Sequence, residues 1–227
     1  MRVFEIFHSL QGEGLLAGAP SVFVRLAGCP FRCRWCDTAY AWDYTAGEEL
    51  NPAEIVGRIG QWPCRHVVLT GGEPLAGPEM DLRSGFVDLT HRLRAFGRHV
   101  TIETAGVLFA PDLACDLASI SPKLGNSTSP AAHQMPSINA DVLSRWIAAF
   151  PYQLKFVIAA PGDIDEVQAV LRGLPTVDPD RVLLMPQART REELQARSPM
   201  VADLCLRTGF RFCDRLHVLL WGEERGR

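Results

Sequence analysis

Short apolar runs typical of β-strands alternate along this chain with segments whose apolar residues recur at helical spacing. Strands are predicted over residues 1–6, 21–26, 66–70, 99–103, 113–120, 153–159, 181–185 and 216–221, and helices over residues 86–96, 140–150, 164–171 and 192–206. A further helix begins after Asn51, which suits its N-cap, with Pro52 at its first position. Strands that alternate with helices pair in parallel through right-handed crossovers.

The number of these units predicts an α/β fold, a partial (β/α)6-type barrel with a mostly parallel sheet. A closed eight-unit barrel typically needs about 250 residues, and this chain has 227. Neither an internal repeat nor an interdomain linker is visible, so we expect one domain over residues 1–227 with short N- and C-terminal extensions. Residues 125–138 are expected to form an irregular loop.

Composition and charge exclude several classes of partner. Apolar residues make up 47% and charged residues 22% of the chain, as in an ordinary soluble protein. No apolar run approaches the roughly 20 residues that span a bilayer, and the first residues do not resemble an export signal. We therefore expect a cytoplasmic protein without membrane contact. The net charge of −3 is spread along the chain, which disfavours a nucleic-acid partner.

Three cysteines, Cys29, Cys33 and Cys36, lie within eight residues, with Trp35 directly before the last. Thiolates are the preferred ligands of iron–sulfur clusters, and three of them can bind three irons of a cubic cluster. The fourth iron would then stay open to a small molecule. This pattern indicates a cluster that can act as a catalyst.

Two other interpretations of the cysteines stay open at this point. A structural zinc site usually has four protein ligands in two short pairs. No second pair follows, although any one of Cys64, Cys115, Cys205 and Cys213 could complete a zinc site by folding close. A disulfide framework is disfavoured, because seven cysteines is an odd number and a chain of this length can build a core without cross-links.

Polar and glycine-rich groups follow almost every predicted strand, where active sites of parallel α/β folds collect. These groups are Thr70-Gly71-Gly72-Glu73-Pro74, Glu103-Thr104-Ala105-Gly106, Ser121-Pro122-Lys123, Lys155 and Met185-Pro186-Gln187. Each also has an ordinary structural explanation: the two glycines could form a tight turn, and Lys123 could be a surface lysine. Their coincidence with the cysteine segment favours an active site.

These residues resemble a known superfamily. The three cysteines with Trp35, together with Gly71-Gly72-Glu73-Pro74, resemble the radical S-adenosylmethionine (SAM) superfamily. Within it, the chain resembles the 7-carboxy-7-deazaguanine synthases nearly end to end, mainly through Leu10-Gln11-Gly12-Glu13-Gly14 and Cys36-Asp37-Thr38. The resemblance implies the partial radical SAM barrel as the fold.

The resemblance also implies an activity. A 4Fe–4S cluster would bind and reductively cleave SAM, and the resulting radical would abstract hydrogen from 6-carboxy-5,6,7,8-tetrahydropterin. Ring contraction with loss of ammonia would yield 7-carboxy-7-deazaguanine, a precursor of queuosine. Such a carbon–nitrogen lyase would use Mg²⁺ and an electron donor such as a flavodoxin or ferredoxin, and would form a homodimer.

The resemblance assigns roles to individual residues. It implies Cys29, Cys33 and Cys36 as cluster ligands; Trp35, Gly72, Glu73, Ser121, Lys123 and Gln187 as SAM-binding residues; Leu10, Gln11, Gly12, Arg25 and Thr70 as pterin-binding residues; and Thr38 as a ligand of Mg²⁺. Arg25 suits the pterin carboxylate because a guanidinium pairs bidentately with such a group, and Mg²⁺ accepts a single protein oxygen beside several waters.

Some alternatives stay open. The hydroxyl of Thr38 could instead bond to its own loop backbone, and no role is assigned to Asp37 or to residues 39–51. An activase that generates a glycyl radical on a partner protein shares the cysteine spacing, but the segment Leu10–Gly14 argues for the small-molecule enzyme. A zinc-stabilised binding module without catalysis is the alternative from another class.

Overall fold

A single curved sheet of nine strands runs through the computed structural model of the chain, which describes residues 1–128 and 132–226. The strand order is β3 (Glu48–Glu49), β1 (Arg2–Leu10), β2 (Pro20–Leu26), β4 (His66–Gly71), β5 (His99–Thr104), β6 (Leu117–Ile120), β7 (Tyr152–Ile158), β8 (Val182–Pro186) and β9 (Arg211–Phe212). Strand β1 pairs antiparallel with β2 and β3, and all other neighbours are parallel. The predicted α/β fold with a mostly parallel sheet is confirmed.

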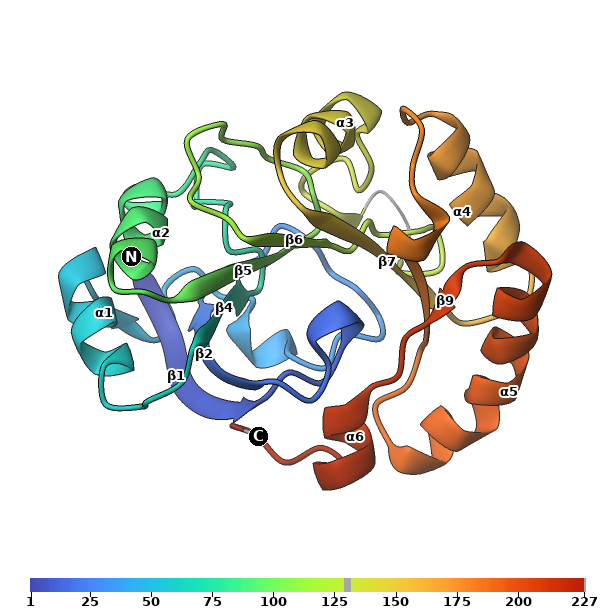
Figure 1. The fold of residues 1–227 in the computed structure, drawn as a ribbon, viewed down its shortest axis with the longest axis horizontal. Coiled ribbons are helices and arrows are strands. Elements are labelled where there is room, and N and C mark those ends of the chain that lie inside the picture. Colours follow the sequence, from blue (N-terminus) through green and yellow to red (C-terminus); the bar gives the residue numbers. More distant parts are fainter. Residues whose placement is uncertain (129–131, 227) are drawn as a thin grey trace.

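Helices cover the convex side of this sheet, and the chain that follows β1 and β2 lies on the concave side (Figure 1). The helices are α1 (Pro52–Ile59), α2 (Phe86–Ala95), α3 (Ala140–Ala149), α4 (Asp163–Arg172), α5 (Arg191–Thr208) and α6 (Leu216–Trp221). Among the described residues, no helix has both the length and the apolar character needed to cross a membrane. The architecture is an open barrel with α1 to α5 outside and α6 at the gap between its edges.

The alternation of side chains along β2 shows how the sheet separates core from cavity. Val22 and Val24 are fully buried and join the main core, in which they share a cluster with Leu89 of α2. Phe23 and Arg25 point to the concave side, where they line a cavity. Burial of the apolar face against the helices therefore fixes which β2 residues face the cavity.

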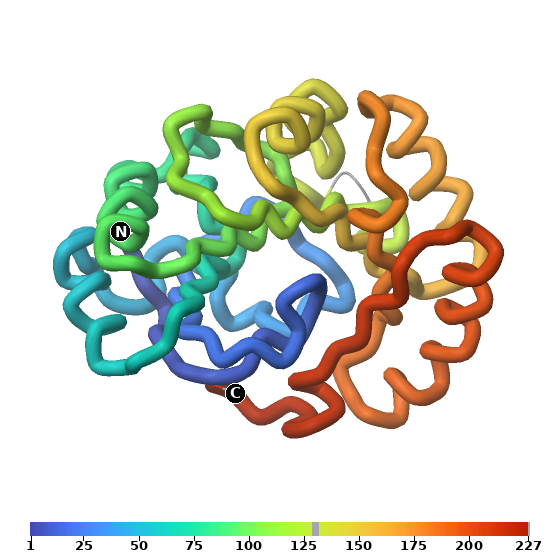
Figure 2. Tube along the Cα trace, in the orientation of Figure 1, coloured from blue at the N-terminus to red at the C-terminus, as the bar shows by residue number. Residues whose placement is uncertain are grey.

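The C-terminal segment fills the gap of the open barrel between β9 and β1 (Figure 2). The amide of Leu216 donates to the carbonyl of Gly12 at 2.8 Å, and the amide of Gly14 donates to the Cys213 Sγ at 3.1 Å. Residues from the two ends of the sequence therefore meet inside the barrel.

One predicted element is wrong: residues 216–221 form helix α6 instead of a last strand. The run Leu-His-Val-Leu-Leu-Trp is apolar almost throughout, and so short a run does not distinguish strand from helix by periodicity. Arg191 donates to the carbonyls of Leu219 and Leu220 at the end of α6, which satisfies acceptors that a helix end leaves free. The last strand of the sheet is the two-residue β9, which the sequence pattern did not predict.

Two further predictions concern element boundaries. The strand predicted over residues 113–120 is regular only over β6, although Leu113 and Cys115 before it are buried in the core. The N-cap of α1 is confirmed: the Asn51 side chain accepts from the Glu54 amide at 3.0 Å, and the Glu54 carboxylate accepts from the Asn51 amide at 2.7 Å. Of the predicted loop 125–138, residues 129–131 lie outside the described residues.

Candidate active site

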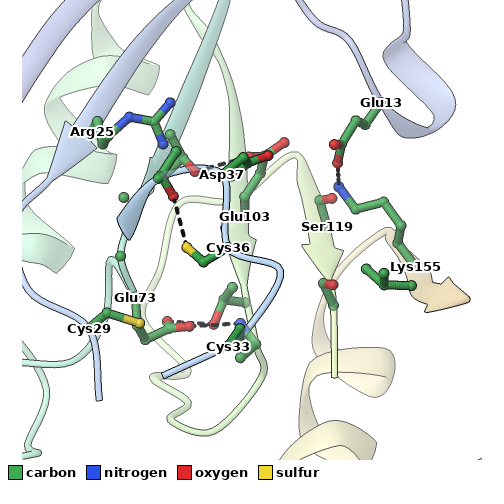
Figure 3. Close-up of a pocket in the computed structure, with 18 of the residues that line it drawn as sticks. Glu13, Arg25, Cys29, Cys33, Cys36, Asp37, Glu73, Glu103, Ser119 and Lys155 are labelled. Atoms are coloured by element: carbon green, nitrogen blue, oxygen red, sulfur yellow. Dashed lines mark hydrogen bonds and ion pairs between the residues drawn. The ribbon is translucent and has the colours of Figure 1, made fainter. Parts of the chain in front are cut away.

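A cavity of about 220 Å³ opens on the concave side, where β2, β4, β5, β6 and β7 end. It is lined by every residue that the sequence predicted for the cluster, the cosubstrate, the pterin and the magnesium ion, except Gln187: Leu10, Gln11, Gly12, Arg25, Cys29, Cys33, Trp35, Cys36, Thr38, Thr70, Gly72, Glu73, Ser121 and Lys123. Gln187 lines a second hollow, which shares Trp35 with the main cavity. Residues from distant parts of the sequence therefore meet around one space (Figure 3).

The three cysteines of the loop after β2 are free thiols that line this cavity. Cys29 and Cys33 are each 6% exposed, and Cys36 is half-buried. Burial raises the pKa of the Cys29 thiol to about 12 and also raises the pKa of Cys33. Binding of iron stabilises the thiolates that such burial disfavours, because the positive metal charge offsets the loss of solvation.

The three thiols form a donor set that suits an iron–sulfur cluster. They are free and line one cavity from a single loop. Each thiolate can bind a different iron of a cubic cluster. Throughout residues 1–128 and 132–226, no group of three or more acidic, histidine or cysteine side chains is arranged to hold a single metal ion.

Backbone contacts fix the cysteine loop on both sides. The amide of Cys29 donates to the Trp42 carbonyl at 3.2 Å, so the unassigned segment 39–51 supports the loop. From the other side, the amide of Arg34 donates to the Ser127 carbonyl at 2.8 Å, and the amide of Arg32 donates to the His133 Nδ1 at 3.1 Å. The described flanks of the loop 125–138 therefore hold the outer edge of the cysteine loop.

Trp35 offers a test of whether an organic cosubstrate fits beside the cysteines. Its indole Nε1–H is buried and has no hydrogen-bond partner among the described residues. The Nζ of Lys123 lies 5.8 Å from the ring centroid, and Lys123 donates to the carbonyl and hydroxyl of Ser121 at 2.9 and 3.2 Å. A buried donor without an acceptor is costly unless a ligand satisfies it. The aromatic face, the free donor and the two polar side chains fit the adenosine and carboxylate parts of SAM.

Gly72 and Glu73 lie where the loop after β4 touches the cysteine loop. A Cβ atom at Gly72 would lie 2.2 Å from the Gly28 carbonyl oxygen and 2.5 Å from the Cys29 Cβ, so only glycine fits there. Glu73 is 1% exposed and accepts from the Thr104 hydroxyl and the Ala105 amide, both at 2.7 Å. Burial raises its pKa despite these bonds. It forms no ion pair with any residue described, so a cationic ligand would complete its environment.

Glu103 lies at the floor of the cavity and orients the side chains around it. Nothing in the sequence distinguished it from an ordinary solvent-exposed residue at the end of a strand. Its two carboxylate oxygens accept from the Gln11 Nε2 and the Thr70 hydroxyl, each at 3.0 Å. Both donors were predicted to bind substrate. Glu103 therefore orients two of the predicted substrate contacts and itself lines the cavity.

Arg25 lies at the opposite wall. Its Nε pairs with the Glu5 carboxylate at 2.7 Å, and its guanidinium carbon lies 5.7 Å from the centroid of the Phe7 ring. Its terminal Nη1 and Nη2 atoms have no partner among the residues that the structure describes. The pair with Glu5 thus orients the guanidinium and leaves two donors for an anionic ligand.

The sequence analysis missed a network of charges across the barrel gap, whose two cations are buried and whose outer carboxylate, Asp37, is exposed. Glu13 pairs with Lys155, and Arg215 bridges Glu13, at 3.1 Å, to Asp37 (Figure 3 shows Glu13 facing Lys155). Burial opposes ionisation of Glu13, but the charges of Lys155 and Arg215 outweigh it, and the pKa of Glu13 is lowered. The pKa of Lys155 is raised, because the attraction of Glu13 outweighs burial. Lys155 stood at a predicted strand end, and Glu13 and Asp37 lie in the segments that carry the family resemblance, but no pattern in the sequence pointed to Arg215.

His217 also lines the cavity, and Gly12 gives it room. A Cβ atom at Gly12 would lie 2.1 Å from the Nδ1 of His217, so the imidazole ring lies directly against the backbone at that position. Burial lowers the pKa of His217. The glycine predicted to contact substrate therefore also positions a side chain from the C-terminal segment.

Known proteins are similar to this chain over nearly its whole length. A family model described as the radical SAM superfamily matches residues 24–124. The 7-carboxy-7-deazaguanine synthase of Pyrobaculum aerophilum is 41% identical over 235 residues, covering 100% of this chain and 97% of that protein. The protein of that name from Halobacterium salinarum is 40% identical over 238 residues, covering 96% and 90%. The crystal structure of QueE from Escherichia coli has the same fold, with a TM-score of 0.71 at 24% identity over 95% of this chain and 94% of that chain.

Proposed function

The chain belongs to the 7-carboxy-7-deazaguanine synthase family of the radical SAM superfamily, and from that membership we propose how its cavity serves the reaction. It is a carbon–nitrogen lyase of queuosine biosynthesis that depends on a 4Fe–4S cluster and SAM. We infer that its substrate is 6-carboxy-5,6,7,8-tetrahydropterin, which loses ammonia as its ring contracts. The meeting of the three thiols with the Glu103 hydrogen-bond set in one cavity is the observation that carries this proposal.

The cysteine side of the cavity is proposed to hold the cofactors. Cys29, Cys33 and Cys36 would bind the cluster, which when bound supplies the electron that cleaves SAM. Glu73 would accept from the methionyl ammonium, since it is a buried carboxylate that forms no ion pair within the described part of the chain. Trp35 would pack against the adenosine part, with its indole N–H satisfied by the cosubstrate.

Ser121 and Lys123 are proposed to bind the ribose or carboxylate of the cosubstrate. Their mutual hydrogen bonds hold them together at one wall of the cavity. Gln187 is a weaker candidate for the adenine, because it lines the second hollow, which has only Trp35 in common with the residues that line the cavity.

The floor and the opposite wall are proposed to hold the pterin. Gln11 and Thr70 are oriented by Glu103 and so present fixed polar groups to the substrate ring. Gly12 and Leu10 line the same floor. Holding a reactant in one orientation lowers the entropy cost of reaction, and these bonds exist before the substrate arrives.

The pterin carboxylate is proposed to bind the free Nη1 and Nη2 atoms of Arg25. Replacement of Arg25 by alanine should raise the KM for the pterin at least about tenfold, as expected when a charged hydrogen bond is lost. Uncoupled cleavage of SAM should stay near the wild-type rate. Steady-state kinetics on both activities measure this. Arg58→Ala is the control, because Arg58 also pairs with a glutamate but lies far from the cavity. An equal fall of both activities would place Arg25 in the cofactor site or the fold.

Thr38 is proposed as a ligand of Mg²⁺ that also meets the substrate carboxylate. Its hydroxyl makes no cap bond to the helical turn that follows it, and it shares a hydrogen bond of 3.6 Å with the Cys36 Sγ. Thr38→Val should raise the Mg²⁺ concentration for half-maximal turnover at least about tenfold, the scale on which metal sites respond to loss of a supporting group. Titration of activity with Mg²⁺ measures the shift. Thr45→Val, an exposed threonine of the same segment, should behave as wild type, and an unshifted Thr38→Val curve refutes the assignment.

The whole reaction is tested by one anaerobic assay. Protein prepared without oxygen is incubated with a reductant, SAM and the carboxytetrahydropterin, and the product is identified by mass. Formation of 7-carboxy-7-deazaguanine together with 5′-deoxyadenosine supports the proposal. Protein that contains iron and sulfide, yet forms neither product, contradicts it.

Further partners follow from the chemistry. Reduction of the cluster requires a one-electron donor, for which a flavodoxin or ferredoxin is proposed. A reducing compartment such as the cytoplasm suits the thiolate ligands. A homodimer is proposed from the family resemblance alone, and light scattering of the purified protein tests it.

A further inference from the structure

Arg83 is a buried arginine that takes no part in the roles proposed above. It is 7% exposed and follows β4 by a loop of irregular chain. Its Nε donates to the Pro74 carbonyl at 3.1 Å, and its Nη2 donates to the carbonyls of Ala27 and Ala76 at 2.8 and 2.7 Å. Pro74 directly follows Glu73 and Ala76 lies three residues after it, whereas Ala27 precedes the first cluster cysteine by two residues. One guanidinium therefore joins the Glu73 loop to the base of the cysteine loop.

Two backbone hydrogen bonds join the same loops. The amide of Gly72 donates to the Leu26 carbonyl at 3.2 Å, and the amide of Glu73 donates to the Gly28 carbonyl at 3.0 Å. The carbonyl of Ala27, which accepts from Arg83, lies between these two backbone acceptors in the sequence. Three consecutive carbonyls, from residues 26, 27 and 28, are thus held by the loop after β4, and the middle one is held by a side chain.

The chemistry of these contacts requires arginine. Arg83 forms no ion pair with any residue of the described chain, and its charge is stabilised by carbonyl dipoles. Burial lowers its pKa, yet a guanidinium stays protonated in proteins. Its rigid fork presents separate donors to carbonyls at three different positions, whereas a lysine has one nitrogen that cannot reach all three.

We propose that Arg83 is a positioning residue for SAM: it fixes the separation between Glu73 and the cysteine loop. This inference rests on the proposed function, in which one cosubstrate contacts both loops at once. Such a ligand binds tightly only where the two loops are held at the spacing that it spans. Arg83 touches neither the cavity nor the proposed ligands, so it acts through the backbone that it holds.

The test compares Arg83→Lys with wild type in protein reconstituted without oxygen. Arg83→Lys should keep the wild-type iron and sulfide content but bind SAM at least tenfold more weakly in equilibrium titration. The change that SAM causes in the electron paramagnetic resonance spectrum of the reduced cluster should need correspondingly more SAM. Arg92→Lys, an exposed α2 arginine paired with Asp88, is the matched control and should match wild type in both readouts.

A double-variant cycle with Glu73→Gln distinguishes positioning from general loosening. If Arg83 acts through the placement of Glu73, Arg83→Lys should weaken SAM binding much less in the Glu73→Gln background than in wild type. Full additivity in the cycle overturns the proposal. So does a wild-type affinity in Arg83→Lys, or an affinity loss that only parallels a loss of iron. Wild-type protein without iron and sulfide would instead overturn the proposed function, and the Arg83 inference with it.

Discussion

Replacement of Cys33 by alanine is expected to abolish reductive cleavage of SAM. Cys33 is buried, lines the cavity and lies between the other two thiols on one loop. Its loss removes one of only three protein ligands that the loop offers the cluster, so the activity should fall by far more than the roughly 10–100-fold typical of changes in groups around a metal site. Release of 5′-deoxyadenosine under reducing, anaerobic conditions measures the effect.

A matched cysteine variant shows whether that loss belongs to the loop. Cys205 lies in α5, packed in the main core and outside the cavity. Cys205→Ala should therefore keep its iron and sulfide and cleave SAM at close to the wild-type rate. Undiminished cleavage by Cys33→Ala would refute the cluster assignment. Loss of iron from both variants would mean that the cluster responds to stability and not to that thiol.

Local spacing and strand ends account for what the sequence could predict. The cysteine loop is contained in eight consecutive residues, so its ligands need no tertiary information. Thr70, Ser121 and Lys123 were found because parallel strands end at a common edge, and polar groups after separate strands therefore meet. The same reasoning singled out Gln187, which lines a second hollow that shares Trp35 with the cavity, and its role in SAM binding stays a prediction.

Contacts between the two ends of the chain could not be predicted. Arg215 lies after a two-residue strand and before a helix that resembled a strand, so no pattern placed it beside Glu13 and Asp37. Glu103 could have been recognised from the β4–β5 register. His66 pairs with His99, so the inward positions Thr70 and Glu103, four residues further along each strand, meet on one face. The sequence alone did not supply that register.

The charge network around buried Lys155 is the feature whose disruption should cost the most stability. Lys155 is 5% exposed, and Glu13 is its ion-pair partner among the described residues. Glu13→Gln therefore strands a buried cation, which typically costs about 3–5 kcal/mol. Lys155→Met should cost less, because Glu13 keeps its pair with Arg215 at 3.1 Å. The free energy of unfolding from anaerobic urea denaturation measures both.

A double variant tests whether the loss of stability in Glu13→Gln comes from the unpaired Lys155. Glu13→Gln combined with Lys155→Met removes the stranded cation, so it should be more stable than Glu13→Gln alone.

The pKa of Glu13 is lowered from 4.5 in the folded chain, so the contribution of Glu13 to folding stability is present above about pH 4.5 and is lost as the pH falls below that value. The stability difference between wild type and Glu13→Gln should therefore shrink as the pH is lowered from 6 to 3. The exposed pair Arg58–Glu48 is the control and should show little effect at any pH. Either of two results would contradict a stabilising role for these charges at the barrel gap. One is a double variant that is no more stable than Glu13→Gln. The other is a stability difference between wild type and Glu13→Gln that grows as the pH is lowered.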